Sequence, residues 1–240
     1  MSVRSADGVP IEFRVYRGPG AGNAVIVCHG FFKSKETRVF DRMSRALAIR
    51  HDVLTMDFRG HGRSGGLYTF SAREGADLEA VLAWARSRYA HLGVLGFSLG
   101  GAIAINTICR SPAGVRSLIT VSAPAGFREI EFKWWTPEAI RRGIRGLRPG
   151  AGCRPGNLWL KKERPVDNMA ALRVPVLFVH GTRDMIVDAR HSRRLFEAAP
   201  EPKRLEIIKG GSHAEGLFQD DPEGFTRLIE RWWTETLPTS

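Results

Sequence analysis

The stretch Gly96-Phe97-Ser98-Leu99-Gly100-Gly101 ends an apolar run over 91–97 and begins a helical pattern over 99–110. It is a G-x-S-x-G sequence at a strand–turn–helix junction, a context in which the serine stands on a sharp turn with its hydroxyl exposed. Glycines on both sides of the serine let the strand and the helix approach closely. The alternative is a glycine-rich turn with an incidental serine, but the flanking strand and helix favour Ser98 as a nucleophile.

Strands and helices alternate on both sides of this junction. Apolar or alternating runs predict strands over 11–17, 24–28, 52–57, 91–97, 115–121, 175–180 and 204–208. Apolar residues at helical spacing predict helices over 36–50, 71–89, 99–110, 189–199 and 222–237. Ser71 and Glu74 are expected to form a capping box at the start of the second helix. The alternation predicts an α/β fold, a mostly parallel central sheet flanked by helices, with ligands beyond the carboxyl ends of its strands.

One segment interrupts the alternation, since no strand-like run occurs between 124 and 173. We expect residues 1–125 and 166–240 to form one core domain, and residues 126–165 to form a small cap or lid. The cap contains ten Lys and Arg against four Glu. It also contains three tryptophans, which are Trp134, Trp135 and Trp159. Either these tryptophans line a substrate pocket while the arginines attract an anionic or acyl substrate, or the segment is a structural cap of an arginine-rich protein.

The composition excludes several classes of protein. With 43% hydrophobic and 25% charged residues, the 240-residue chain is neither disordered nor collagen-like. Its three cysteines include no C-x-x-C pair, which argues against a disulfide framework or a zinc site and suits a reducing compartment. Early charged residues and the lack of a long apolar run predict no signal peptide, no transmembrane segment and a cytoplasmic location. The formal net charge of +11 would suit nucleic acid, but no recognition module accompanies it, so we expect no nucleic-acid binding.

Four further motifs follow predicted strands. His29-Gly30-Phe31 follows the first buried strand, and Asp57–Ser64 follows the next one with the pattern D-x-R-G-x-G-x-S. His180-Gly181-Thr182-Arg183-Asp184 and Gly210-Gly211-Ser212-His213 follow the last two strands. Together with G-x-S-x-G, and over almost the whole chain, these motifs resemble the α/β-hydrolase family. The resemblance is to its small bacterial serine esterases and acyl hydrolases, including the feruloyl-esterase-like group.

The resemblance implies the α/β-hydrolase fold and a catalytic triad in the chain order nucleophile, acid, base. Ser98 is expected to be the nucleophile, and His213 the general base that takes its proton. Asp184 is expected to orient the imidazole and to stabilise its charged form. Two other carboxylates remain alternatives for the acid. Asp188 suits an N-cap of the following helix, and Asp57 matches a position that some branches of the family use.

The same resemblance implies an oxyanion hole made by the backbone N–H groups of Phe31 and Leu99. Phe32 is expected to line the substrate pocket with the three cap tryptophans, the alternative being that its ring packs in the core. His29, His61 and His180 are expected to brace loops. No metal or organic cofactor is expected.

These features predict a serine hydrolase that cleaves small-molecule carboxylic esters through an acyl-enzyme on Ser98. The alternatives are a thioesterase, a lipase-like or amide hydrolase, and a non-catalytic binding protein with the same fold.

Overall fold

The computed structural model describes residues 1–19, 22–127 and 152–237. In this part of the chain, eight strands form a sheet in the order β1-β2-β4-β3-β5-β6-β7-β8. Their bounds are β1 (Ser2–Arg4), β2 (Pro10–Tyr16), β3 (Asn23–Cys28), β4 (Asp52–Met56), β5 (His91–Phe97), β6 (Val115–Val121), β7 (Val176–Gly181) and β8 (Lys203–Ile208). The strands from β3 to β8 pair in parallel, while β1 and β2 pair antiparallel at one edge. The α/β fold with a mostly parallel sheet is therefore confirmed.

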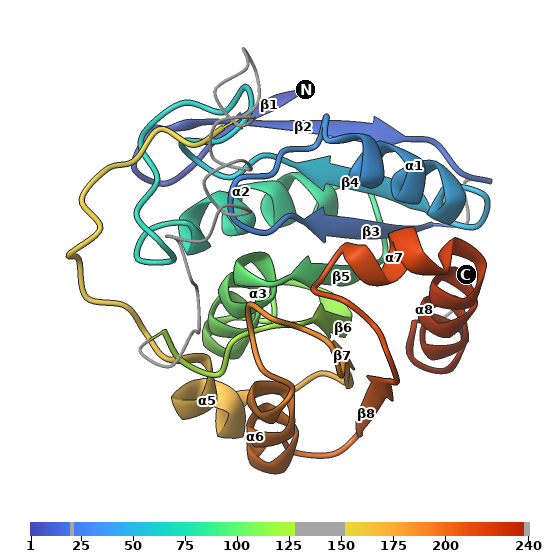
Figure 1. The fold of residues 1–240 in the computed structure, drawn as a ribbon. Coiled ribbons are helices and arrows are strands. Elements are labelled where there is room, and N and C mark those ends of the chain that lie inside the picture. The colour runs from blue at the N-terminus through green and yellow to red at the C-terminus, as the bar shows by residue number, and fades with distance from the viewer. Residues whose placement is uncertain (20–21, 128–151, 238–240) are drawn as a thin grey trace.

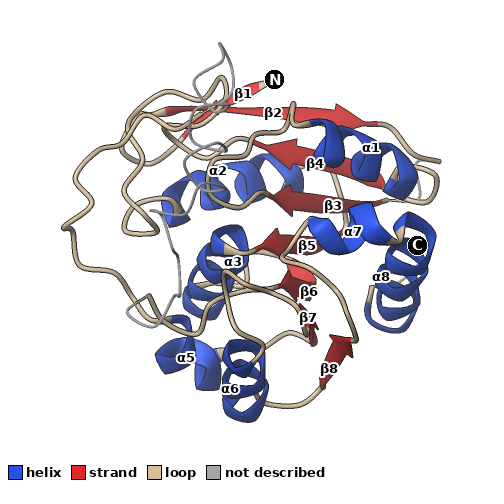
Figure 2. Ribbon diagram, viewed as in Figure 1, coloured by secondary structure: helices blue, strands red, loops and turns tan. Residues whose placement is uncertain are grey.

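Helices cover both faces of the sheet (Figure 1). Their bounds are α1 (Arg38–Leu47), α2 (Gly75–Arg86), α3 (Leu99–Arg110), α5 (Pro165–Asn168), the 3-10 turn η1 (Met169–Ala171), α6 (Arg190–Ala198), α7 (Gly216–Asp220) and α8 (Pro222–Thr236). Helices α2, α3 and α6 contribute to the hydrophobic core on one face, and α1, α7 and α8 contribute to the core on the other. Figure 2 shows the strands as one layer between these two groups.

Burial on both faces explains why the central strands read as continuous apolar runs. Every residue of β3 and β4 is buried, and so is every residue of β5 after His91. Strand β8 lies at the edge, and all of its residues are half-buried. The three cysteines are free thiols, as expected for a chain without a disulfide framework.

The predicted capping box is wrong. Helix α2 begins at Gly75, and Ser71 lies four residues ahead of it with a positive φ of 80°. The Glu74 carboxylate is buried and turns back to the preceding loop, where it accepts hydrogen bonds from the N–H of Thr69 and the N–H of Arg73. Glu74 therefore caps the turn that precedes the helix. The pattern in the sequence could not distinguish this turn from a first helical turn.

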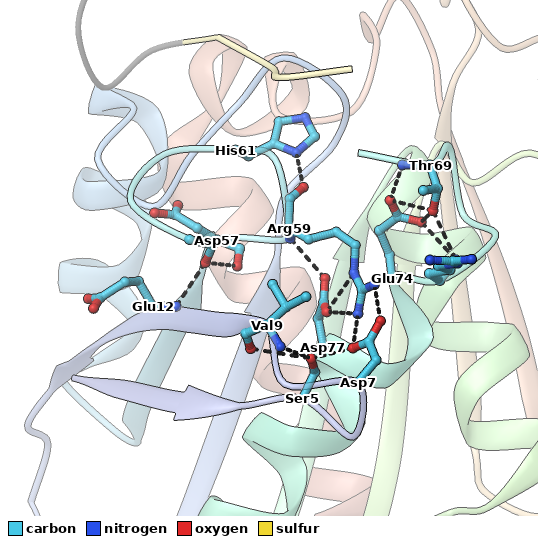
Figure 3. A network of polar contacts seen from close by, with 12 residues as sticks. Ser5, Asp7, Val9, Glu12, Asp57, Arg59, His61, Thr69, Glu74 and Asp77 are labelled. Carbon is cyan, nitrogen blue, oxygen red and sulfur yellow. Dashed lines mark hydrogen bonds and ion pairs between the residues drawn. The ribbon is translucent and has the colours of Figure 1, made fainter. Parts of the chain in front are cut away.

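A buried ion-pair network ties the N-terminal hairpin to α2. Arg59, in the loop after β4, lies between Asp7 and Asp77, as Figure 3 shows. Its Nε and Nη2 donate to Oδ1 of Asp77 at 2.9 and 2.7 Å, and its Nη1 and Nη2 donate to Asp7 at 2.6 and 2.9 Å. Burial raises the pKa of Asp77 to about 6, although the Arg59 guanidinium acts in the opposite direction. Arg59 is therefore the cation that compensates a buried carboxylate.

Replacing Arg59 by methionine is expected to lower the free energy of unfolding by about 3 kcal/mol or more near pH 8, because a buried charge loses its partner. The folded-state pKa of Asp77 lies above its reference value of 3.8. Without the guanidinium this pKa rises further, so Asp77 of the variant takes up its proton at a higher pH, and the loss should shrink as the pH falls from about 8 to about 6. Urea unfolding over that pH range measures the effect. A loss that grows on acidification would contradict this account.

Candidate active site

Ser98 occupies a strained turn between β5 and α3. Its backbone has φ 50° and ψ −119°, outside the regions that residues with a side chain prefer. The neighbouring glycines are sterically required. A Cβ on Gly96 would lie 2.6 Å from Cα of Gly101, and one on Gly100 would lie 2.4 Å from the carbonyl oxygen of His29. The G-x-S-x-G spacing thus allows strand, helix and the loop after β3 to meet around the serine.

The loop after β3 lies against the serine. A Cβ on Gly30 would lie 3.2 Å from Cβ of Ser98, so Phe31 follows a residue that faces the nucleophile position. Leu99 is the first residue of α3, and its N–H therefore has no acceptor within the helix. This arrangement suits an oxyanion hole made by the N–H groups of Phe31 and Leu99, which remains a prediction.

Asp184 and His213 meet beyond the carboxyl ends of β7 and β8. His213 Nδ1 lies 2.7 Å from Oδ2 of Asp184, and the side chain of Asp184 is fully buried. The other carboxylate oxygen accepts the N–H groups of Ile186 and Val187, both at 2.9 Å. Burial opposes ionisation of Asp184, but hydrogen bonds from His180 and His213 outweigh it and hold its pKa well below its usual range. Asp184 is therefore ionised, and Nδ1 of His213 donates to it.

The structure does not join Ser98 to His213 directly. Within the described residues, the Ser98 hydroxyl makes no hydrogen bond. Catalytic hydrogen bonds are often long when no substrate is bound and tighten in the complex. The structure thus forms one of the two links of the expected triad and places the serine at the same edge of the sheet.

The two alternative acids have other partners. Asp57 is buried and forms an ion pair with Lys35 Nζ at 2.5 Å, while it also accepts the N–H of Arg63. Asp188 accepts the N–H of Arg190, the first residue of α6, but Ala189 is the N-cap of that helix, so the N-cap expected at Asp188 is one residue off. Neither carboxylate contacts His213 in the part of the chain that the structure describes. The geometry therefore favours Asp184 over both.

Three further histidines have contacts that agree with loop bracing. His29 Nδ1 lies 2.7 Å from the carbonyl oxygen of Gly30, and its Nε2 accepts the N–H of Phe58. His61 Nδ1 donates to the carbonyl oxygen of Arg59 at 3.1 Å, and burial lowers the pKa of His61 to about 3. His180 Nε2 lies 3.1 Å from Oδ2 of Asp184.

Aromatic rings gather on the loop that follows β3. The ring of Phe31 lies 3.8 Å from that of Phe32, 5.0 Å from that of Tyr68 and 5.8 Å from that of Phe70. Phe70 extends the group to Phe127 at 5.7 Å. Phe32 is 37% exposed, so the alternative that its ring packs in the core is wrong. These rings form an apolar wall next to the loop that faces Ser98.

Of the predicted cap, residues 126–127 and 152–165 are described. Trp134 and Trp135 lie outside the described residues. Trp159 is 95% exposed, and it does not join the aromatic wall. The segment around Arg154 pairs with the loop after β4, where the N–H of Tyr68 donates to the carbonyl oxygen of Arg154 at 2.8 Å. This part of the cap thus lies along the loop that carries two of the aromatic rings.

Other possible sites lie apart from this one. A cavity of about 570 Å³ lies between the start of α2 and the face of α3 that carries Thr107 and Arg110, and the triad residues do not line it. Among the described residues, no cluster of three metal-ligating side chains occurs, and no helix is long and apolar enough to cross a membrane.

Comparisons with known proteins show the family and the fold of this chain. A sequence model of the alpha/beta hydrolase family matches residues 25–228. The uncharacterized protein Rv2307c of Mycobacterium tuberculosis is 31% identical over 230 residues, which cover 90% of this chain and 72% of that protein. The esterase RhEst1 from Rhodococcus sp. ECU1013 has a TM-score of 0.78 at 24% identity, covering 98% of both chains. The Pyrococcus furiosus esterase Pf2001 has a TM-score of 0.80 at 20% identity, covering 99% of this chain and 92% of that one. At these identities the two structures show a shared fold.

Proposed function

The chain belongs to the alpha/beta hydrolase family, and from this membership we propose that it is a serine esterase that hydrolyses small-molecule carboxylic esters. The observation that carries the proposal is the 2.7 Å hydrogen bond between His213 and a buried, ionised Asp184. Ser98 stands at the same sheet edge on a strained turn. A carboxylate that orients an imidazole, at the sheet edge that also carries a strained serine, supports acyl transfer through that serine.

The reaction proceeds in two halves. His213 Nε2 takes the proton of Ser98 Oγ while Oγ bonds to the carbonyl carbon of the ester, and the carbonyl oxygen becomes an oxyanion. The intermediate collapses as His213 gives its proton to the departing alcohol, which leaves an acyl group on Ser98. Water then loses a proton to His213 and attacks the acyl carbon. His213 returns that proton to Ser98 Oγ as the bond between Oγ and the acyl carbon breaks and the carboxylic acid leaves. Asp184 stays ionised throughout and stabilises the imidazolium that forms twice.

The oxyanion is held by the N–H groups of Phe31 and Leu99. Removing one such donor typically costs roughly 3 kcal/mol of transition-state stabilisation. Gly30 supports this role because a Cβ there would lie only 3.2 Å from Cβ of Ser98, so glycine allows the loop after β3 to approach the serine. Both donors belong to the backbone, so their positions depend on the strained turn and on the loop.

The aromatic wall of Phe31, Phe32, Tyr68, Phe70 and Phe127 supports an apolar acyl or aromatic group in the substrate. We also propose that residues 126–165 cover the site as a cap, with Trp134, Trp135 and Trp159 as candidates for contact with the substrate. The reaction needs no metal or organic cofactor. A cytoplasmic location and the lack of nucleic-acid binding remain predictions of the sequence.

Initial rates on p-nitrophenyl esters from acetyl to palmitoyl test the proposal. We expect turnover that depends on Ser98, with a preference for short or aromatic acyl groups, because the described wall next to the loop that faces Ser98 is aromatic. An optimum at long acyl chains would instead indicate a lipase-like enzyme. Absence of Ser98-dependent turnover on oxygen esters, thioesters and anilides alike would refute the proposal and favour a binding protein.

A further inference from the structure

Asp184 lies between two imidazole rings. Its Oδ2 is 2.7 Å from Nδ1 of His213 and 3.1 Å from Nε2 of His180. The mechanism proposed above uses only the first ring. His180 is fully buried. It is the second-last residue of β7 and precedes the loop that carries Asp184.

The partners of His180 determine where its proton is. Nε2 lies 2.7 Å from the carbonyl oxygen of Val187 and 3.1 Å from the ionised carboxylate of Asp184, and both of these groups can only accept. Nε2 therefore carries the proton. Nδ1 lies 2.6 Å from Oγ of Ser192 on α6, so the Ser192 hydroxyl donates to it. A neutral His180 with the proton on Nε2 satisfies all of these groups at once.

We propose that His180 is a positioning residue of the reaction: its single N–H, shared between Val187 and Asp184, aims the carboxylate at His213. The inference rests on the proposed function, since it assigns a role within that triad. The residue acts through Asp184 and does not touch the reacting atoms.

The N–H of His180 helps to position both oxygens of the Asp184 carboxylate. Oδ1 is held by the N–H groups of Ile186 and Val187, and the carbonyl of that same Val187 is held by His180. Oδ2 is contacted by His180 itself. His180, a residue of the sheet, therefore fixes the loop whose N–H groups bind Oδ1 of Asp184. Oδ2 remains directed at His213. Without this N–H, the carboxylate keeps its charge but loses a donor and part of its orientation.

His180→Phe removes the N–H and keeps a ring of similar size. We expect kcat to fall roughly 10- to 100-fold with KM changed less than about threefold, as when groups that orient a catalytic ligand are lost. Because the carboxylate loses a donor, it attracts the proton of His213 more strongly. The acid limb of the pH profile of kcat/KM should therefore move to higher pH by roughly 0.5 unit. His180→Gln, whose amide can donate to the same acceptors, should recover part of both effects.

His191→Phe is the matched control. His191 is also fully buried, precedes Ser192 on α6 and accepts the N–H of Ala125, but it makes no hydrogen bond or ion pair with Asp184, which is also a described residue. This variant should lose stability without moving the acid limb. If His180→Phe and His191→Phe alter kcat and the acid limb alike, the role of His180 is merely structural and the inference is wrong.

A spectroscopic measurement separates this inference from the proposed function. The proton between His213 Nδ1 and Asp184 should give a downfield proton resonance in the wild-type protein, whether or not any tested ester is hydrolysed. In His180→Phe we expect that resonance to shift or broaden, and in His191→Phe to stay in place. An unchanged resonance in folded His180→Phe, or in His180→Met if the phenylalanine variant does not fold, would overturn the inference, because both side chains lack the N–H. Absence of ester turnover with a shifted resonance would overturn the proposed function alone.

Discussion

Replacing Ser98 by alanine is expected to lower kcat for p-nitrophenyl acetate by roughly 10,000-fold or more, to near the rate left by binding and the oxyanion hole. The reason is that the acyl-enzyme cannot form without Oγ. His213→Ala should cost about as much, because the serine hydroxyl is a weak nucleophile until a base takes its proton. Steady-state rates of purified variants measure both effects.

The fold should survive these changes. Alanine at position 98 adopts the same backbone conformation as serine, and the Ser98 side chain makes no hydrogen bond to other described residues. We therefore expect the thermal unfolding midpoint of Ser98→Ala to lie within about 4 °C of the wild-type value, as for a change below about 1 kcal/mol. A fully active Ser98→Ala protein with an intact fold would rule out the mechanism.

Replacing Asp184 by asparagine is expected to lower kcat by roughly 1,000- to 10,000-fold. Asparagine keeps the shape of the carboxylate, but it loses the charge that stabilises the imidazolium. Its amide can also present N–H groups to His213 Nδ1, which favours the wrong tautomer of the ring. The measurement is again the steady-state rate on p-nitrophenyl acetate, with the unfolding midpoint as a check on the fold.

Asp188→Asn is the matched control for this prediction. Asp188 lies four residues further along the same loop, and its carboxylate accepts the N–H of Arg190 at the start of α6. Its variant should retain activity within about threefold, with at most the roughly 1 kcal/mol loss of stability expected when a hydrogen bond at a helix start is lost. If Asp188→Asn loses activity while Asp184→Asn retains it, the assignment of the acid is wrong.

The sequence predicts the strands and the motifs at their ends because both depend on local patterns. The buried run directly before Ser98 has the pattern of a strand. Glycine is required at 96 and 100 because a Cβ at either position would clash with the neighbouring backbone, as the G-x-S-x-G motif implies. Asp184 and His213 follow predicted strands at the same sheet edge, so their meeting follows from the topology.

Contacts between distant segments could not be predicted in this way. Arg59 pairs with Asp7 across 52 positions of the chain, and neither residue belongs to a periodic pattern that would link them. The contact of His180 with Asp184 was also missed. Its spacing of four residues was visible, but in a loop that spacing does not fix whether the ring faces the carboxylate. The exposure of Phe32 was also open, because a loop has no periodic pattern that assigns a side chain to the core or to the surface; the ring is 37% exposed.

The central claim is that Ser98 is an activated nucleophile. Intact-protein mass spectrometry after incubation with a fluorophosphonate, followed by peptide mapping, tests it without any assumption about the natural ester. The account predicts one phosphonyl adduct per chain on Ser98, no adduct in Ser98→Ala and much slower labelling in His213→Ala. Wild-type protein that remains unlabelled, or an adduct that maps to another residue, would contradict it.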